Sequence, residues 1–135
     1  MKKLLILLPL SLFLSGCFGG LGGTGGGETN KLTFSQGKVV EGFPGIPGYK
    51  NSQVLESIGY QGKYGLSNVT GDKIEKVIEY YGKALGQLGW ETSLKKRSAT
   101  NYAYGIKNEK QKGEMIMNTA ADGKKTAISV FIEER

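Results

Sequence analysis

The sequence predicts an α+β fold, a predominantly antiparallel sheet with one amphipathic helix packed on one of its faces. Residues 73–88 carry apolar side chains at the three-to-four spacing of a helix, and the four stretches after them alternate apolar and polar residues as strands do. Short intervals rich in turn residues separate these stretches, as in antiparallel hairpins. We therefore expect two layers and a ββαββββ-like order of elements.

The start of the chain has the layout of an export signal. Met1-Lys2-Lys3 is a positive start, residues 4–14 are almost wholly apolar, and small residues follow. A membrane-spanning helix needs about 20 apolar residues, and this run is shorter. We expect residues 1–16 to be a lipoprotein signal peptide that is removed.

The residues Leu14-Ser15-Gly16-Cys17 follow the apolar run, and Cys17 is the only cysteine of the chain. This tetrapeptide resembles the lipobox of small prokaryotic lipoproteins, in which the Cys thiol receives a diacylglycerol and the signal is cut just before it. The resemblance implies an extracytoplasmic protein held by acyl chains such as palmitate in the cell membrane or the outer membrane, and two acyl chains anchor a protein stably. The alternative is a soluble secreted protein whose signal ends near a cysteine.

The segment after Cys17 is mostly glycine up to residue 30, and it cannot offset the entropy of ordering a fold. We expect residues 17–30 to be a lipidated, flexible tether with an r.m.s. span of about 20 Å, which keeps the domain close to the membrane. The Gly-x-Gly spacings within it have neither the preceding strand nor the following helix of a phosphate-binding loop. A single α+β domain is expected over 31–135.

Alternation and turn residues mark the first strands of this domain. Residues 31–35 alternate and predict a short strand, whereas the Gly- and Pro-rich stretch 42–49 predicts an irregular loop. Two further β-like runs over 53–60 and 63–68 flank Gln61-Gly62, which predicts a hairpin turn.

The segment 73–88 is the most strongly patterned part of the chain. Its apolar stripe consists of Ile74, Val77, Ile78, Tyr81, Leu85 and Leu88. Asp72 predicts a side-chain cap at the start of the helix. Gly89 predicts a left-handed end that lets Trp90 fold back on Leu85.

Two glycines, Gly82 and Gly86, interrupt the helix away from its ends. Each costs about 1 kcal/mol relative to Ala in a helix interior. They predict the close approach of a strand along this flank, and the alternative is a contact with another chain.

Four β-like stretches follow the helix, over 90–96, 102–107, 114–120 and 126–132. Alternate residues of the last three share a face, and these sets are Tyr102, Tyr104 and Ile106; Met115, Met117 and Thr119; Thr126, Ile128, Val130 and Ile132. Asp122-Gly123 predicts a hairpin between the last two strands.

The region 43–90 resembles a group of small prokaryotic lipoproteins and secreted domains. These carry a Tyr-Pro-Gly-type segment before a helix that ends in Phe/Tyr-Tyr, Leu and Gly-Trp. The matching residues here are Tyr80-Tyr81, Leu85 and Gly89-Trp90, whereas the first motif has the altered order Pro47-Gly48-Tyr49. The resemblance implies the compartment and the fold, and it brings no catalytic residues.

The residue content excludes several kinds of chemistry. The chain has no histidine, which removes Ser-His and Cys-His nucleophilic arrangements and the commonest transition-metal ligand. Glu75 and Glu79 lie on the solvated side of the helix, and Glu133-Glu134 lie near the chain end, so we interpret them as surface charges. We expect no catalytic residue, no metal site and no cofactor.

Positive charge gathers in the C-terminal half. Lys95, Lys96 and Arg97, with Tyr102 and Tyr104 nearby in the expected sheet, are candidate anion-binding residues. Further cations are Lys107, Lys110, Lys112, Lys124 and Lys125. The alternative interpretation is that these lysines solubilise edge strands and turns. Loss of Lys2 and Lys3 with the signal lowers the formal net charge from +6 to a mild +4.

These observations predict a membrane-anchored, non-enzymatic accessory or interaction module of the cell envelope. The expected partners are the membrane, through the lipid on Cys17, and an envelope protein or anionic polymer; nucleic acid is not expected in this compartment. The first alternative is a receptor for an anionic envelope polymer or lipid head groups. The second is a small hydrolase that uses carboxylates.

Overall fold

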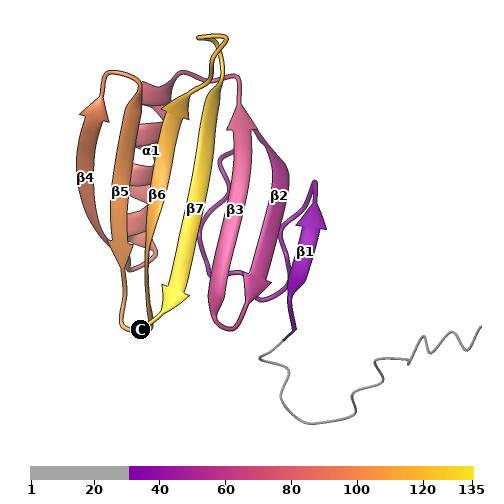
Figure 1. Ribbon diagram of the computed structural model, residues 1–135. Helices are drawn as coiled ribbons and strands as arrows, with labels where there is room; N and C mark the ends of the chain where they lie inside the picture. Colours follow the sequence, from indigo (N-terminus) through magenta and orange to yellow (C-terminus); the bar gives the residue numbers. More distant parts are fainter. Residues whose placement is uncertain (1–30) are drawn as a thin grey trace, which may run out of the picture.

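The structure, a computed structural model, describes residues 31–135. The predicted signal peptide (1–16) and the predicted lipidated tether (17–30) lie outside the described residues. In the described part, seven strands form one sheet and a single helix lies against one face of it (Figure 1). This arrangement confirms the predicted α+β fold.

Neighbouring strands of the sheet all run antiparallel. The elements are β1 (Thr33–Gln36), β2 (Ser52–Tyr60), β3 (Lys63–Thr70), α1 (Ile74–Gln87), β4 (Glu91–Ser98), β5 (Asn101–Lys107), β6 (Gln111–Thr119) and β7 (Thr126–Glu134). The strand order is β1-β2-β3-β7-β6-β5-β4, so the last strand of the chain lies at the centre and β1 and β4 form the edges. Helix α1 carries the chain from β3 to the far edge at β4 (Figure 1).

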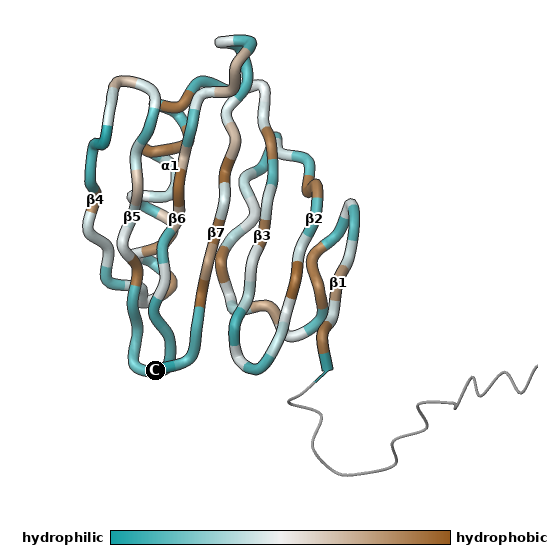
Figure 2. Tube along the Cα trace, viewed as in Figure 1, coloured by the Kyte–Doolittle hydropathy of each residue, from teal (hydrophilic) through white to brown (hydrophobic). Residues whose placement is uncertain are grey.

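The core lies between α1 and the sheet. Ile128 and Val130 of β7 are buried, and they pair across the sheet with the buried Met117 and Met115 of β6. The helix contributes the buried side chains Ile74, Val77, Tyr81 and Leu85. Figure 2 shows hydrophobic segments recurring along β7 and α1. Full burial of a side chain of this size contributes about 1.5–3 kcal/mol, so this layer is the main source of stability.

The helix start differs from the prediction. Lys73 is the capping residue, and no side chain caps the first turn. The carboxylate of Asp72, which was expected to cap, instead accepts a hydrogen bond of 2.6 Å from the hydroxyl of Tyr49. The prediction of an Asp72 cap is therefore wrong, because a partner from the preceding loop takes its carboxylate.

The helix end agrees with the prediction. Gly89 has φ +86°, and the N–H of Trp90 donates to the carbonyl of Leu85 at 3.0 Å. The N–H of Gly89 donates to the carbonyl of Gly86 at 3.2 Å, which completes a Schellman-type end. Leu88 is 56% exposed, however, because the helix ends before it.

The two helix glycines have different surroundings. A Cβ added at Gly82 would lie 3.0 Å from the hydroxyl of Tyr104 on β5, which confirms the predicted close approach of a strand. A Cβ added at Gly86 would meet nothing within 4 Å. Gly86 therefore has no packing role in the described part of the chain.

The loop between β1 and β2 covers the part of the sheet that α1 does not reach. The hydroxyl of Ser57 accepts from the N–H of Val40 and donates to the carbonyl of Lys38, both at 2.8 Å. The indole N–H of Trp90 donates to the carbonyl of Gly45 at 3.3 Å, which joins this loop to the helix end. Helix and loop together cover one face of the sheet.

Both predicted turns are present. Gln61 and Gly62 have φ values of 48° and 72° and connect β2 to β3 directly. Between β6 and β7, Gly123 has φ +69°, and the carboxylate of Asp122 accepts from the N–H groups of Lys124 and Lys125 at 2.8 and 3.0 Å. This second connection spans residues 120–125 and is wider than a two-residue turn.

Candidate functional site

The predicted anion-binding residues Lys95, Lys96 and Arg97 lie on β4, an edge strand whose 8 residues are all exposed. Lys96 is in register with Tyr102, which in turn pairs with the buried Met117, so Lys96 and Tyr102 lie on the helix side of the sheet. The Lys96 ammonium nitrogen is 5.8 Å from the centre of the Tyr102 ring. The structure brings this pair together.

The other two cations lie on the opposite face. Lys95 is in register with Ala103, and Arg97 forms an ion pair with Glu114. Because successive side chains of a strand point to opposite faces, the three neighbouring cations are split between two surfaces. One of the three is also already paired.

Tyr104 belongs to the core, not to the surface that the sequence suggested. It is 5% exposed, and its hydroxyl donates to the carbonyl of Ile78 at 2.9 Å. Burial also raises the pKa of Tyr104 above its ordinary value of 10.0. A group held in this way is not available to a ligand on the surface.

The further lysines do not form one basic rim either. Lys107 and Lys112, at one end of the sheet, pair with Glu91 and Glu133 at 3.4 and 3.5 Å. Residues 124–125 lie in the loop between β6 and β7, at the other end of these strands. This distribution suits solubilising charges.

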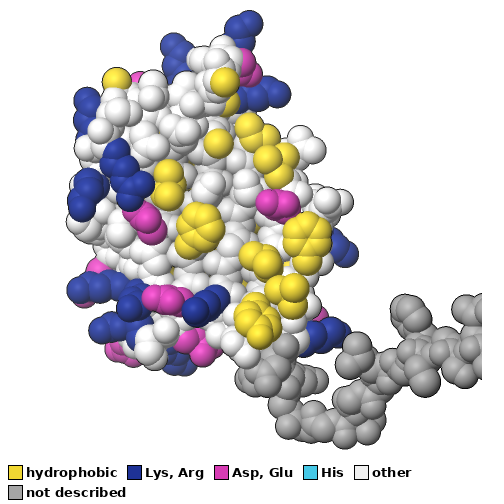
Figure 3. Space-filling view, viewed as in Figure 1, with side chains coloured by type: hydrophobic (Ala, Val, Ile, Leu, Met, Phe, Trp, Pro, Cys, Tyr) yellow, Lys and Arg dark blue, Asp and Glu magenta, His cyan; other side chains and the backbone are white. Residues whose placement is uncertain are grey.

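The face of the sheet opposite α1, which we call the open face, carries a group of exposed apolar side chains. Phe34 of β1, Ile58 of β2 and Phe131 of β7 lie on it and are 57, 42 and 56% exposed. Phe34 pairs with Ile58, and Gly65 of β3 lies between Ile58 and Phe131 in the register. We call these three side chains the apolar patch. Figure 3, viewed from this side, shows hydrophobic side chains gathered over β1, β2 and β7.

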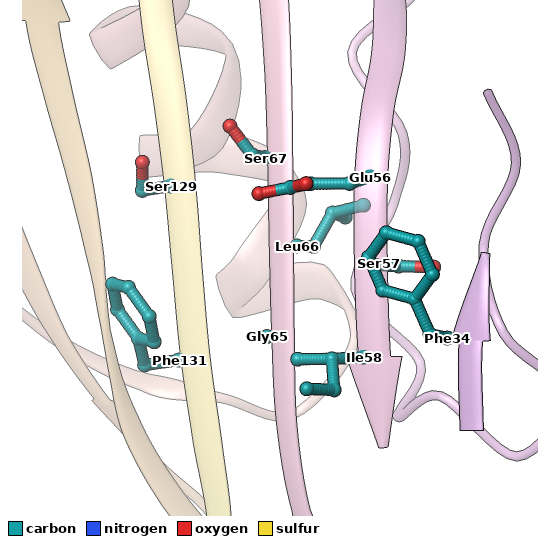
Figure 4. Close-up of a pocket in the computed structure, with 9 residues that line it drawn as sticks. All are labelled: Phe34, Glu56, Ser57, Ile58, Gly65, Leu66, Ser67, Ser129 and Phe131. Atoms are coloured by element: carbon teal, nitrogen blue, oxygen red, sulfur yellow. The ribbon is translucent and has the colours of Figure 1, made fainter. Parts of the chain in front are cut away.

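The apolar patch borders a shallow groove of about 280 Å³. Its lining residues are Phe34, Glu56, Ser57, Ile58, Gly65, Leu66, Ser67, Ser129 and Phe131. In Figure 4 the apolar side chains lie toward one end, whereas Glu56, Ser67 and Ser129 place oxygen atoms at the other. A Cβ added at Gly65 would lie 3.0 Å from Ile58, so this glycine keeps the floor of the groove low.

The polar end of the groove contains one ionisable side chain, Glu56. Glu56 has no ion pair within residues 31–135. The groove therefore offers an apolar surface, two hydroxyl groups and a carboxylate. These groups can bind a molecule by contact and hydrogen bonding.

Two further properties concern metals and membranes. Within residues 31–135, no group of three or more His, Cys, Asp or Glu side chains is placed to hold a metal ion. The one helix found in this part of the chain is too short and too polar to cross a bilayer.

Sequence reasoning missed the apolar patch because it followed only the core-facing residues of each strand. Phe131 lies between Val130 and Ile132, and a run of three apolar residues in an alternating strand places the middle one on the other face. Phe34 was assigned to a strand, but its partner strand is not evident from the sequence. The signal that could have revealed this site is an apolar residue at a strand position whose side chain points away from the core.

Comparisons with protein-family models, curated proteins and solved structures find no match for this chain.

Proposed function

We propose that this chain is an extracytoplasmic lipoprotein, anchored through Cys17, whose domain is a non-enzymatic interaction module of the cell envelope. Its binding surface is the open face of the sheet. The observation that carries the proposal is the apolar patch of Phe34, Ile58 and Phe131, which no described element covers. Contiguous exposed apolar side chains beside a groove are typical of interaction sites in soluble domains.

The chemistry of the groove supports binding more than catalysis. General acid–base catalysis uses a positioned proton donor or acceptor, commonly with a second group that orients it. Glu56 is the one ionisable group that lines the groove, and no second carboxylate accompanies it. This supports a module that acts by contact.

The position of β1 supports a surface that works close to the membrane. The described chain begins at residue 31, and β1 starts at Thr33, beside Phe34 of the apolar patch. A tether over 17–30 would therefore reach the domain at the edge of the open face. Partners in or on the same membrane would meet this face readily.

Photo-crosslinking in the intact cell envelope tests the proposal. A photoreactive amino acid at Phe131 of the full chain should give covalent protein adducts, because this side chain stands in the middle of the open face. The matched control is the same probe at Gln87, which is exposed at the end of α1. Adducts at 131 and none at 87 are the expected result, and equal yields or no adduct at 131 would contradict the proposal.

A second candidate function, binding of an anionic envelope polymer or lipid head groups, is favoured by the exposure of Lys95 and Lys96 on β4. Binding of this kind weakens steeply with salt, because exposed charges are screened over about 8–10 Å at 0.1–0.15 M ionic strength. Retention on anionic vesicles at low salt, lost when Lys95, Lys96 and Arg97 are neutralised together, would support it. Retention that ignores the triple substitution would reject it.

A further inference from the structure

We propose that the open face binds a second copy of this chain, so that two sheets pack face to face in a two-fold symmetric dimer. The inference rests on the proposed function of this face as an interaction surface, and it names the partner. Symmetric dimers are the commonest soluble oligomers, and each copy must present a surface that complements itself. The open face meets this condition in its shape, its charges and the position of the tether.

The first observation is an asymmetry of side-chain size across the sheet. One row of paired residues on the open face runs Phe34, Ile58, Gly65, Phe131, Glu114, Gly105 and Ser93, from β1 to β4. In this row bulky residues occupy the β1–β2 side, small residues occupy the β5–β4 side, and Phe131 lies on the central strand. The ion pair between Arg97 of β4 and Glu114 of β6 spans β5 on the same face, so a second copy would pack against it as well. A two-fold axis parallel to the strands and passing over β7 would place β2 of one copy over β5 of the other.

This superposition matches bulky residues with small ones. Ile58 of each copy would face the region of Gly105, and Phe34 would face the region of Ser93, while the two Phe131 rings would meet near the axis. Sheets that pack face to face lie about 10 Å apart with strands within about 30° of each other, which side chains of these sizes fill. The same pairs recur on both sides of the axis because the contact is isologous.

The second observation is charge. The next row on the open face runs Glu56, Ser67, Ser129, Ile116, Ala103 and Lys95. Glu56 lies toward one edge and Lys95 at the other, and neither forms an ion pair within residues 31–135. The same axis would bring Glu56 of one copy close to Lys95 of the other, twice in each dimer.

The third observation is the position of the start of β1, which the predicted tether would join. In Figure 1 the start of β1 lies at the lower end of the sheet, and an axis parallel to the strands would leave it at the same end in both copies. Two chains anchored in one membrane can therefore form this dimer without crossing the assembly. Anchoring both copies also raises their effective concentration.

The size of the face is sufficient. The six intervals between the seven strands, at about 4.8 Å each, and strand lengths of about 26 Å give a face of about 750 Å² per copy, close to the roughly 800 Å² per partner of a standard interface. The bilayer surface is a poorer occupant, because Glu56, which has no ion pair within residues 31–135, would face anionic head groups within the contact. A membrane contact and a different protein are the other outcomes of the test.

Cysteine crosslinking of the full, lipidated chain in its membrane tests the dimer. Ser129→Cys places a thiol on the central strand near the proposed axis, and it is the only free thiol when Cys17 carries lipid. A bismaleimide that spans about 10 Å, the spacing of packed sheets, should give a product of twice the chain mass. The control Gln87→Cys, on the helix side, should give none.

The outcomes separate the dimer from the proposed function. A Ser129→Cys product that contains a different protein would overturn the dimer and leave the open face as an interaction surface. No product at all would overturn the dimer, and the absence of photo-adducts from position 131 would reject the proposed function as well. Products at both cysteine positions would indicate random collision and would also overturn the dimer.

Charge reversal supplies a second test. Glu56→Lys should lower the dimer yield about fivefold, because two exposed ion pairs of ordinary strength are lost and repulsion replaces them. Lys95→Glu should do the same, and the double variant Glu56→Lys/Lys95→Glu should regain most of the yield. Glu79→Lys on the outer side of α1 is the control and should change nothing. Failure of the double variant to recover, with all variants folded, would overturn this pairing of the two copies.

Discussion

At the scale of single residues, the pair Tyr49 and Asp72 links the loop before β2 to the start of α1. The hydroxyl of Tyr49 donates to the Asp72 carboxylate, and the hydroxyl of Thr126 on β7 donates to the Asp72 carbonyl at 2.7 Å. Asp72 therefore connects loop, helix and central strand. Sequence reasoning assigned Asp72 to a cap because capping is a local pattern, whereas its actual partner lies in an irregular loop without periodicity.

This link predicts a pH dependence of stability. The hydrogen bond from Tyr49 holds the pKa of Asp72 below its ordinary value of 3.8. A carboxylate with a lowered pKa in the folded state stabilises the fold above its unfolded pKa, and the contribution is lost as pH falls through the folded pKa. Between pH 5 and about 2, the free energy of unfolding measured with urea should therefore fall more for the wild-type protein than for Asp72→Asn. Identical pH profiles for the two proteins would contradict the assignment.

Tyr49 responds at the other end of the pH scale. Burial and the hydrogen bond to Asp72 raise the pKa of Tyr49 to about 12. Its stabilising effect is complete below the ordinary tyrosine pKa of about 10 and is lost as pH rises toward 12. Tyr49→Phe should remove this alkaline loss while keeping the ring contacts with Tyr80 and Tyr81, and ultraviolet titration of the phenols would detect the change.

At the scale of elements, local patterns predicted most of the fold. The helix, both turns and the strands around them depend on spacing and turn residues that lie within a few positions of each other. The position of β1 at an edge and the pairing of β3 with the distant β7 depend on contacts far apart in sequence, which one chain does not reveal. The apolar patch is assembled by these distant pairings, and for this reason it was not predicted.

The helix offers a matched pair of core and surface leucines. Leu85 is 0% exposed, whereas Leu88 lies just past the helix end and is exposed. Leu85→Ala should lower the free energy of unfolding by about 2–5 kcal/mol, the cost of a buried truncation. Leu88→Ala should change it by less than about 0.5 kcal/mol. Denaturant unfolding measures both, and similar costs for the two would mean that this face of the helix is not the core.

The two helix glycines make a second matched pair. Gly86→Ala should raise the free energy of unfolding by as much as about 1 kcal/mol, because Ala is the better helix former and its Cβ meets nothing. Gly82→Ala should gain less, because its Cβ would press on the Tyr104 hydroxyl that is bonded to Ile78. Equal gains in thermal or urea unfolding would argue against close packing of β5 on this flank.

At the scale of the whole molecule, the sheet is covered on one face only, and the start of the chain is predicted to carry a lipoprotein signal. The anchor remains a prediction from Leu14-Ser15-Gly16-Cys17 and the apolar run before it. Cys17→Ser should abolish lipid labelling and leave unprocessed precursor or, if another peptidase cuts, soluble protein. Normal processing and unchanged membrane fractionation of this variant would contradict the anchor.

The central claim is that the open face is covered by a partner in the membrane. The most direct test measures the rate of thiol labelling at Ser67→Cys, a position that lines the groove of the open face. The rate is compared between the native membrane and protein dispersed in dilute detergent. Gln87→Cys on the helix side serves as the reference, and Cys17 is predicted to carry lipid and therefore not to compete for the label. We predict that position 67 is labelled severalfold more slowly in the membrane than after dispersal, with no such change at position 87, since a packed interface excludes solvent. Equal rates at position 67 in both states would contradict the claim.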